Sequence, residues 1–273
     1  MLAGPSEADA MGLNNAMALK LMDAYGRGDL RGGSALTLGT LRMRGVGANR
    51  ARLRRSSQAA GLSGDLTPFT KPRPEGFLNQ LGYDRFHELD VSGYEGADIL
   101  ADLNQPLPER LHNQFDLIVD GGTLEHVFNV PVAFANVLSI LKVGGVFSST
   151  NTFSGEPCHG LYQFNPDLVW SFWKRTCNCE VLSCTLLPAD PTKKAYEMTD
   201  LTGNRRRPSF RQTDFDGLYF LYYEIRKTAE SECRAVSYQS DYEVFWGESA
   251  AKSRANIADN KSSKTESGSH DSI

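Results

Sequence analysis

Short apolar runs alternate along the chain with longer segments in which apolar residues recur every three or four positions. The run at residues 115–122, FDLIVDGG, is nearly all apolar, which is typical of a strand buried on both faces of a parallel sheet. Runs of similar length predict further strands. They cover residues 34–39, 85–92, 97–104, 146–151, 179–187 and 218–228.

The segments between these runs have the spacing of amphipathic helices. Residues 131–145 predict a helix that Gly144 and Gly145 close as its C-cap. Residues 165–176 predict another helix, with Asn165 as its N-cap. Further helices are predicted at residues 13–25, around 47–61 and at 77–82. Because strands alternate with helices, the pattern predicts an α/β fold with a parallel sheet covered by helices on both faces.

The character of the chain changes near both ends of this alternating segment. Residues 1–30 predict an N-terminal helical extension, residues 31–228 carry the α/β pattern, and residues 229–273 form a polar tail. The end of the tail is rich in Lys, Ser and Asp and has no periodicity, which predicts disorder.

The composition excludes several classes of protein. The formal net charge of −4 gives no whole-molecule argument for nucleic acid or an anionic membrane. No apolar run approaches the roughly 20 residues of a membrane span, and the first residues lack the basic start of a secretory signal. Cys177 and Cys179 form C-x-C instead of the C-x-x-C of zinc and redox sites. We therefore expect a cytoplasmic protein with reduced thiols, and no membrane or nucleic-acid partner.

Several ordered features suggest a family. Residues 115–147 combine the buried strand with an L-E-H-V segment and a helix ending in L-K-x-G-G, residues 89–98 read LDVSGYEGAD, and residues 102–104 read DLN. In these features the chain resembles the class I S-adenosylmethionine-dependent methyltransferases, in particular a bacterial branch acting on small molecules. The resemblance covers residues 31–228 and implies a Rossmann-like, doubly wound, mostly parallel seven-stranded sheet. It also implies S-adenosyl-L-methionine as cofactor, across the carboxyl ends of the first four strands, and a small-molecule acceptor.

The resemblance assigns cofactor contacts to residues at strand ends. Asp90 would accept hydrogen bonds from both ribose hydroxyls, for which a carboxylate has two oxygens. Asp102 and the backbone of Leu103 would lie by the adenine. Asp120 and Gly121 would line the site at the end of the fourth strand.

The turn after the first strand departs from the family pattern. Gly39 would let the backbone approach the methionine part of the cofactor, but Thr37 stands where most members have an acidic residue. Thr40 begins a stretch that replaces a second glycine. Thr37 can hydrogen-bond the ammonium group without a charge, and we expect Asp120 to supply the missing negative charge. The alternative is a turn with a purely structural role.

Glu125 and His126 belong to the L-E-H-V segment. It is similar to the E-x-x-E-H segment through which a related group of O-methyltransferases binds a divalent metal. Gly122 takes the place of the first glutamate, and an oxygen-rich magnesium site would need more carboxylates. We therefore expect no metal, and we interpret the pair as bracing the loop after the fourth strand.

Residues 151–170 follow the fifth strand, where this fold places acceptor-side residues. His159 is a candidate general base, because an imidazole titrates near neutrality. Tyr162 and Gln163 are candidates to orient an acceptor hydroxyl. The alternative is that this loop only packs over the sheet edge.

Together these features predict an S-adenosylmethionine-dependent methyltransferase that modifies an oxygen or nitrogen of a small molecule, such as a sugar-linked metabolite. The arginines within residues 42–55 could steer an acidic acceptor, although a solvated helix face explains them more simply. They lack the interleaved aromatics of a platform for single-stranded nucleic acid. One alternative is a catalytically inactive methyltransferase-like binding protein, favoured by the weakened first turn. The other is a nicotinamide-dependent oxidoreductase, which the absence of G-x-G-x-x-G disfavours.

Overall fold

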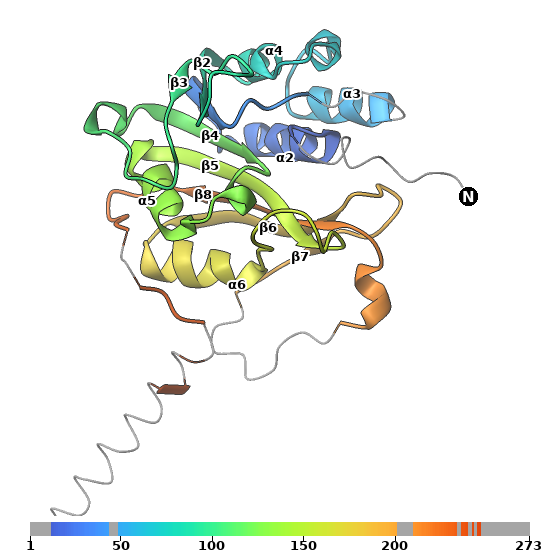
Figure 1. Ribbon diagram of the computed structural model, residues 1–273. Helices are drawn as coiled ribbons and strands as arrows, with labels where there is room; N and C mark the ends of the chain where they lie inside the picture. Colours follow the sequence, from blue (N-terminus) through green and yellow to red (C-terminus); the bar gives the residue numbers. More distant parts are fainter. Residues whose placement is uncertain are drawn as a thin grey trace, which may run out of the picture.

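The computed structural model of the 273-residue chain describes most of the predicted α/β segment (Figure 1). The described residues are 12–43, 49–200, 210–233 and 236–239, together with 242, 245 and 246. Most of the tail that we predict to be disordered lies outside these residues, as does part of the arginine-rich segment.

One twisted sheet forms the centre of the fold, with strands in the order β3-β2-β1-β4-β5-β8-β6-β7. The strands from β3 to β5 pair in parallel, whereas β8 runs antiparallel between β5 and β6. The strands are β1 (Gly33–Leu38), β2 (Tyr83–Asp90), β3 (Ile99–Leu100), β4 (Phe115–Gly121), β5 (Leu141–Ser154), β6 (Glu180–Pro188), β7 (Tyr196–Glu197) and β8 (Tyr219–Arg226). This is the predicted Rossmann-like, mostly parallel sheet.

Helices cover both faces of the sheet, as predicted. On one face lie α2 (Asn15–Gly26), α3 (Arg50–Ala59) and α4 (Glu75–Gln80), and on the other lie α5 (Val130–Ile140) and α6 (Pro166–Leu168), which continues into η5 (Val169–Thr176) (Figure 1). The shorter turns are η2 (Thr67–Thr70), η3 (Glu109–Leu111), η4 (Leu124–His126) and η6 (Gln212–Phe215). The alternation along β1 explains the two layers, because Ala35 packs with the α2 layer and Leu36 with the α5 layer.

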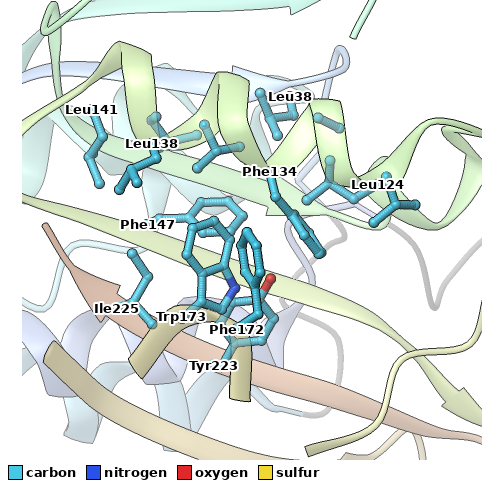
Figure 2. Close-up of a cluster of buried hydrophobic side chains, with 14 of the residues drawn as sticks. Leu38, Leu124, Phe134, Leu138, Leu141, Phe147, Phe172, Trp173, Tyr223 and Ile225 are labelled. Carbon is cyan, nitrogen blue, oxygen red and sulfur yellow. The ribbon is translucent and has the colours of Figure 1, made fainter. Parts of the chain in front are cut away.

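An aromatic cluster fastens α5 and η5 to the sheet (Figure 2). Trp173 of η5 is fully buried, and its ring centroid lies 5.2 Å from that of Phe134 on α5 and 5.6 Å from that of Phe147 on β5. Phe147 in turn lies 5.7 Å from Tyr223 of β8. Because α5 follows β4 and α6 follows β5, this cluster fixes the two loops at the carboxyl ends of those strands.

The end of α5 differs from the prediction. The helix ends at Ile140 and β5 begins at Leu141, so Gly144 and Gly145 lie within the strand and are not a C-cap. The side chain of Lys227 explains the early end: its Nζ donates to the carbonyl oxygens of Leu138 and Leu141, each at 2.7 Å. The residue that follows β8 therefore satisfies these carbonyls without a glycine turn.

Two other elements differ in extent from the prediction. The strand expected at 97–104 is reduced to the two residues of β3. Before it, the Asp98 side chain accepts a hydrogen bond from the Glu88 N–H at 2.7 Å. After it, Asp102 forms a turn with Asn104. The two-residue edge strand β7 makes the sheet eight-stranded where seven strands were expected. At the start of α6 the prediction is confirmed, since Asn165 Oδ1 accepts from the Asp167 N–H at 2.9 Å.

The N-terminal helix α2 packs against the sheet as part of the core, with Met17, Leu21 and Met22 fully buried. Residues 12–30 therefore share one core with the predicted α/β domain. Among the residues that the structure describes, no helix is both long and apolar enough to cross a membrane.

We expect the cysteines to differ sharply in reactivity. Cys158 is exposed on the loop after β5, whereas Cys184 is buried in β6, and burial raises the pKa of its thiol to about 12. At pH 8 only about one Cys184 thiol in ten thousand would then be a thiolate, the form that reacts. Brief alkylation of the native protein, followed by mass spectrometry, should label Cys158 and spare Cys184. Equal labelling of both would contradict the packing of β6.

Candidate cofactor cleft and acceptor loop

The carboxyl ends of β1, β2 and β4 meet at the point where the strand order reverses. In the sheet, Leu38 of β1 is the register partner of Leu89 on one side and of Asp120 on the other. Parallel sheets bind ligands at this kind of switch point. Four predicted residues therefore lie at one edge of the sheet, at or just beyond the ends of neighbouring strands: Gly39, Asp90, Asp102 and Asp120.

The turn after β1 requires a glycine for two reasons. Gly39 has φ +73°, and a Cβ at this position would lie 2.7 Å from the Oγ1 of Thr123. Thr123 is held there because its hydroxyl donates to the Leu38 carbonyl at 2.7 Å. The Gly39 N–H donates to the Leu89 carbonyl at 2.7 Å. The turn is thus tied to both neighbouring strands.

The two threonines of this turn have different surroundings. Thr37 is fully buried, and its hydroxyl donates to the Gly39 carbonyl at 2.9 Å, which closes the turn. The Oγ1 of Thr40 is buried and has no hydrogen-bond partner among the described residues. A buried hydroxyl without a partner is costly, and a rotation of the Thr40 side chain would be needed for a ligand to supply one.

Asp90 and Asp102 lie at the ends of β2 and β3. Asp90 is half-buried, and its Oδ1 accepts from the Ser92 N–H at 3.0 Å, whereas no donor of the described chain reaches Oδ2. Asp102 is exposed, and hydrogen bonds from the backbone and side chain of Asn104 hold the pKa of its carboxyl below the usual range. The side chain of Leu103, next to it, is buried. Both carboxylates can meet a ligand from solvent.

Asp120 is fully buried at the end of β4 and makes four hydrogen bonds. Its Oδ1 accepts from the N–H groups of Thr123 and Leu124, and its Oδ2 accepts from Ser149 Oγ at 2.8 Å and Asn151 Nδ2 at 2.7 Å. Burial raises the pKa of this carboxyl, and the four bonds oppose the shift. They use the four lone-pair positions of a carboxylate. Direct contact with an ammonium group would require one of them to be given up.

Gly121, the last residue of β4, contacts Gly12, the first residue that the structure describes. Its carbonyl accepts from the Gly12 N–H at 3.0 Å, and a Cβ at Gly121 would lie 3.0 Å from the Gly12 backbone. The segment before α2 therefore crosses the end of β4.

The structure brings together three residues that the sequence analysis treated separately. Glu125 and His126 follow β4, and His159 comes from the loop after β5. The Glu125 side chain is fully buried, and His159 Nε2 lies 3.0 Å from its Oε1. The rings of His126 and His159 lie 4.8 Å apart, nearly perpendicular. We call these residues the Glu125 cluster. Their spacing in the sequence carries no signal of it, because the contact depends on β4 and β5 being neighbours.

The other candidate acceptor-side residues fasten the loop. The Tyr162 N–H donates to the Glu125 carbonyl at 3.1 Å, and its hydroxyl donates to the Phe128 carbonyl at 2.8 Å. Gln163 Nε2 donates to the Glu156 carbonyl at 3.1 Å, within the loop itself. The hydroxyl of Tyr162 and the amide of Gln163 are therefore engaged with backbone in this conformation.

A mostly apolar cavity of about 980 Å³ adjoins Tyr162, between α5, α6 and the segment 236–239. Its walls include Val130, Phe134, Leu168, Phe172 and Tyr238. The backbone of Tyr162, which lines the cavity, is hydrogen-bonded to the carbonyl of Glu125.

The predicted fold is confirmed at this point. The sheet is mostly parallel and is covered by helices on both faces, as the resemblance implies, with one extra edge strand. The chain has a Rossmann-like, mostly parallel α/β fold.

The sequence matches no family model. No curated protein matches it either. Solved structures similar to this chain include the Burkholderia thailandensis 1,6-didemethyltoxoflavin-N1-methyltransferase, with 15% identity over 78% of this chain and 80% of that chain, at a TM-score of 0.42. The trans-methyltransferase CalH shares 15% identity over 77% of this chain and 55% of that chain (TM-score 0.40). TehB from Haemophilus influenzae shares 19% identity over 77% of this chain and 62% of that chain (TM-score 0.41). The match thus covers less than two thirds of the length of CalH and of TehB.

Proposed function

We propose that this protein is an S-adenosylmethionine-dependent methyltransferase that acts on an oxygen or nitrogen of a small-molecule acceptor. The observation that carries the proposal is the set of residues at the carboxyl ends of the strands, at the strand switch point. There the tied Gly39 turn, the unpartnered Thr40 hydroxyl and the Asp90 carboxylate all belong to strands that end at one edge of the sheet. The cofactor, when bound, supplies a methyl group on a positively charged sulfur.

The residues of the cleft suit the parts of this cofactor. Asp90 Oδ2 is available to a ribose hydroxyl, and Oδ1 already accepts one N–H and retains a second lone pair. Thr40 supplies a hydroxyl for the amino-acid part, and Asp102 with Leu103 forms the edge beside the expected position of the adenine. Asp120 can act on a ligand only through the groups that it holds, Thr123, Leu124, Ser149 and Asn151.

The Glu125 cluster and Tyr162 form the acceptor side of the proposed site. His159 is partly exposed, with 26% of its side-chain surface accessible, so an acceptor can reach it from solvent. Tyr162 shapes the loop and the mouth of the apolar cavity, which suits an acceptor with an apolar portion. Holding the acceptor in line with the methyl group supplies much of the rate acceleration in such a transfer.

One observation favours the second candidate, an inactive methyltransferase-like binding protein. The turn after β1 has no carboxylate, and the buried Asp120 that we expected to replace it makes four hydrogen bonds of its own. An inactive binding protein would tolerate this loss. The two candidates agree on cofactor binding and differ in turnover.

Thermal unfolding with S-adenosylhomocysteine tests the cofactor assignment. A ligand that binds only the native state stabilises it by about 2.7 kcal/mol at a hundredfold excess over Kd. For a chain of this size we expect the Tm to rise by about 5–10 °C. NADH at the same concentration is the control and should leave the Tm unchanged. A shift with NADH alone would favour the oxidoreductase alternative, and no shift with S-adenosylhomocysteine would end the methyltransferase proposal.

A further inference from the structure

The Glu125 cluster presents three metal-ligand atoms to one small volume. The Oε1 of Glu125 lies 3.0 Å from His159 Nε2 and 3.8 Å from His126 Nε2, and a set of one ligand atom from each residue lies within 4.8 Å. Ligands bound tetrahedrally to one ion at 2.0–2.2 Å lie about 3.4 Å from one another. The observed distances of 3.0 Å and 3.8 Å from Glu125 Oε1 lie on either side of that spacing.

The fold holds the carboxylate and the loop that carries His159 in fixed relation. Both carboxylate oxygens of Glu125 accept hydrogen bonds from Thr152, and the Glu125 N–H donates to Asn151 Oδ1 at 3.1 Å. The Glu125 carbonyl accepts from the Leu161 N–H at 2.7 Å, two residues after His159. Hydrogen bonds from a second layer of residues orient metal ligands in this way.

A separate observation points to a ligand in the cluster. His159 Nε2 is buried, yet it makes no hydrogen bond within the described chain, although it lies 3.0 Å from Glu125 Oε1. The distance is short enough, but the direction of the ring nitrogen misses the oxygen. An ion held between these atoms would satisfy both the nitrogen and the carboxylate. His126 leaves the cluster open to solvent, since 48% of its side chain is exposed.

We propose that Glu125, His126 and His159 bind a divalent transition-metal ion of the zinc and cobalt class. Two imidazoles and one carboxylate suit these ions, whereas magnesium and calcium prefer ligand sets made of oxygen. The proposal differs from the expectation of no metal, which considered Glu125 and His126 without His159. Three protein ligands leave a position for a water molecule or a substrate oxygen.

The consequence for catalysis rests on the proposed methyl transfer. An acceptor hydroxyl bound at the open position would have a lowered pKa and would release its proton to water. Its oxygen would then bond to the methyl carbon while the electron pair of the broken carbon–sulfur bond stays on sulfur. The site would thus select hydroxyl acceptors, and His159 would be a ligand instead of a general base.

Cobalt titration of the full chain tests the site without cofactor or acceptor. After treatment with a chelator and dialysis, Co²⁺ should bind in a ratio of one per chain with a visible d–d absorption band, and Zn²⁺ should displace it. His159→Ala and His126→Ala should each weaken Co²⁺ binding by at least about tenfold, as loss of even a supporting group does. His112→Ala is the matched control, because His112 lies outside the cluster at the end of η3, and it should bind like the parent.

Circular dichroism and thermal melts establish that each variant is folded, and His159→Gln replaces His159→Ala if the latter is not. Failure of the parent protein to bind Co²⁺ would overturn the proposal. Undiminished Co²⁺ binding by both His126→Ala and His159→Ala would also overturn it, because other residues would then hold the ion. Neither result bears on cofactor binding, which the S-adenosylhomocysteine melts measure separately.

Discussion

Replacing Asp90 with alanine is expected to weaken S-adenosylhomocysteine binding by at least about a hundredfold while leaving the protein folded. The carboxylate is proposed to accept from two ribose hydroxyls, and hydrogen bonds to a charged group contribute about 1.5–3 kcal/mol each. Losing two of them costs at least about 3 kcal/mol, or two powers of ten in Kd. The measurement is isothermal titration of each variant with S-adenosylhomocysteine.

The effect on stability should be small, because the only hydrogen bond from the described chain to the Asp90 side chain is the one from the Ser92 N–H. Asp84→Ala is a matched control: Asp84 lies on the same strand but is exposed at its opposite end. It should bind S-adenosylhomocysteine as the parent does. Asp90→Asn keeps the shape of the side chain and loses its charge, so its affinity for S-adenosylhomocysteine should lie between those of Asp90→Ala and Asp84→Ala. Equal affinity in Asp90→Ala and Asp84→Ala would show that β2 does not carry the ribose contact.

The sheet could be predicted because its strands are local signals. The nearly all-apolar run at 115–122 becomes β4 within one residue, and the parallel arrangement then places Asp90 and Asp120 at the same edge. Asp120 shows where this reasoning stops. Its position followed from the strand, but its burial depends on Ser149 and Asn151, which arrive from β5. A role inferred from position alone took no account of those partners.

The end of α5 and the Glu125 cluster both depend on contacts between segments that are distant in the sequence. Gly144 and Gly145 have the form of a helix C-cap, but Lys227 arrives from the far end of the domain and ends the helix earlier. Glu125 and His159 are 34 residues apart in the numbering and meet only because β4 pairs with β5. Contacts of this kind depend on strand order, which the local pattern does not encode.

The largest effect is expected for His159→Ala. If His159 is the proton acceptor, turnover should fall by about a hundredfold to ten-thousandfold; if it is a metal ligand, turnover should fall as well. Affinity for S-adenosylhomocysteine should stay unchanged, because the proposed cofactor residues belong to the ends of β1 to β4 and His159 lies on the loop after β5. Turnover is measured as S-adenosylhomocysteine released with catechol as a hydroxyl surrogate and benzylamine as an amine surrogate.

Comparison with His126→Ala separates the two roles of His159. A general base acts alone, so His126→Ala would keep most of the rate, whereas a shared metal ion would make both variants slow and would favour catechol over benzylamine. His112→Ala should turn over like the parent in either case. A histidine that only packs would give a third pattern, because His159→Ala would then lower the Tm and weaken cofactor binding together with the rate. Full activity in a stable His159→Ala protein would leave alignment of the reactants in the cleft as the source of the rate acceleration.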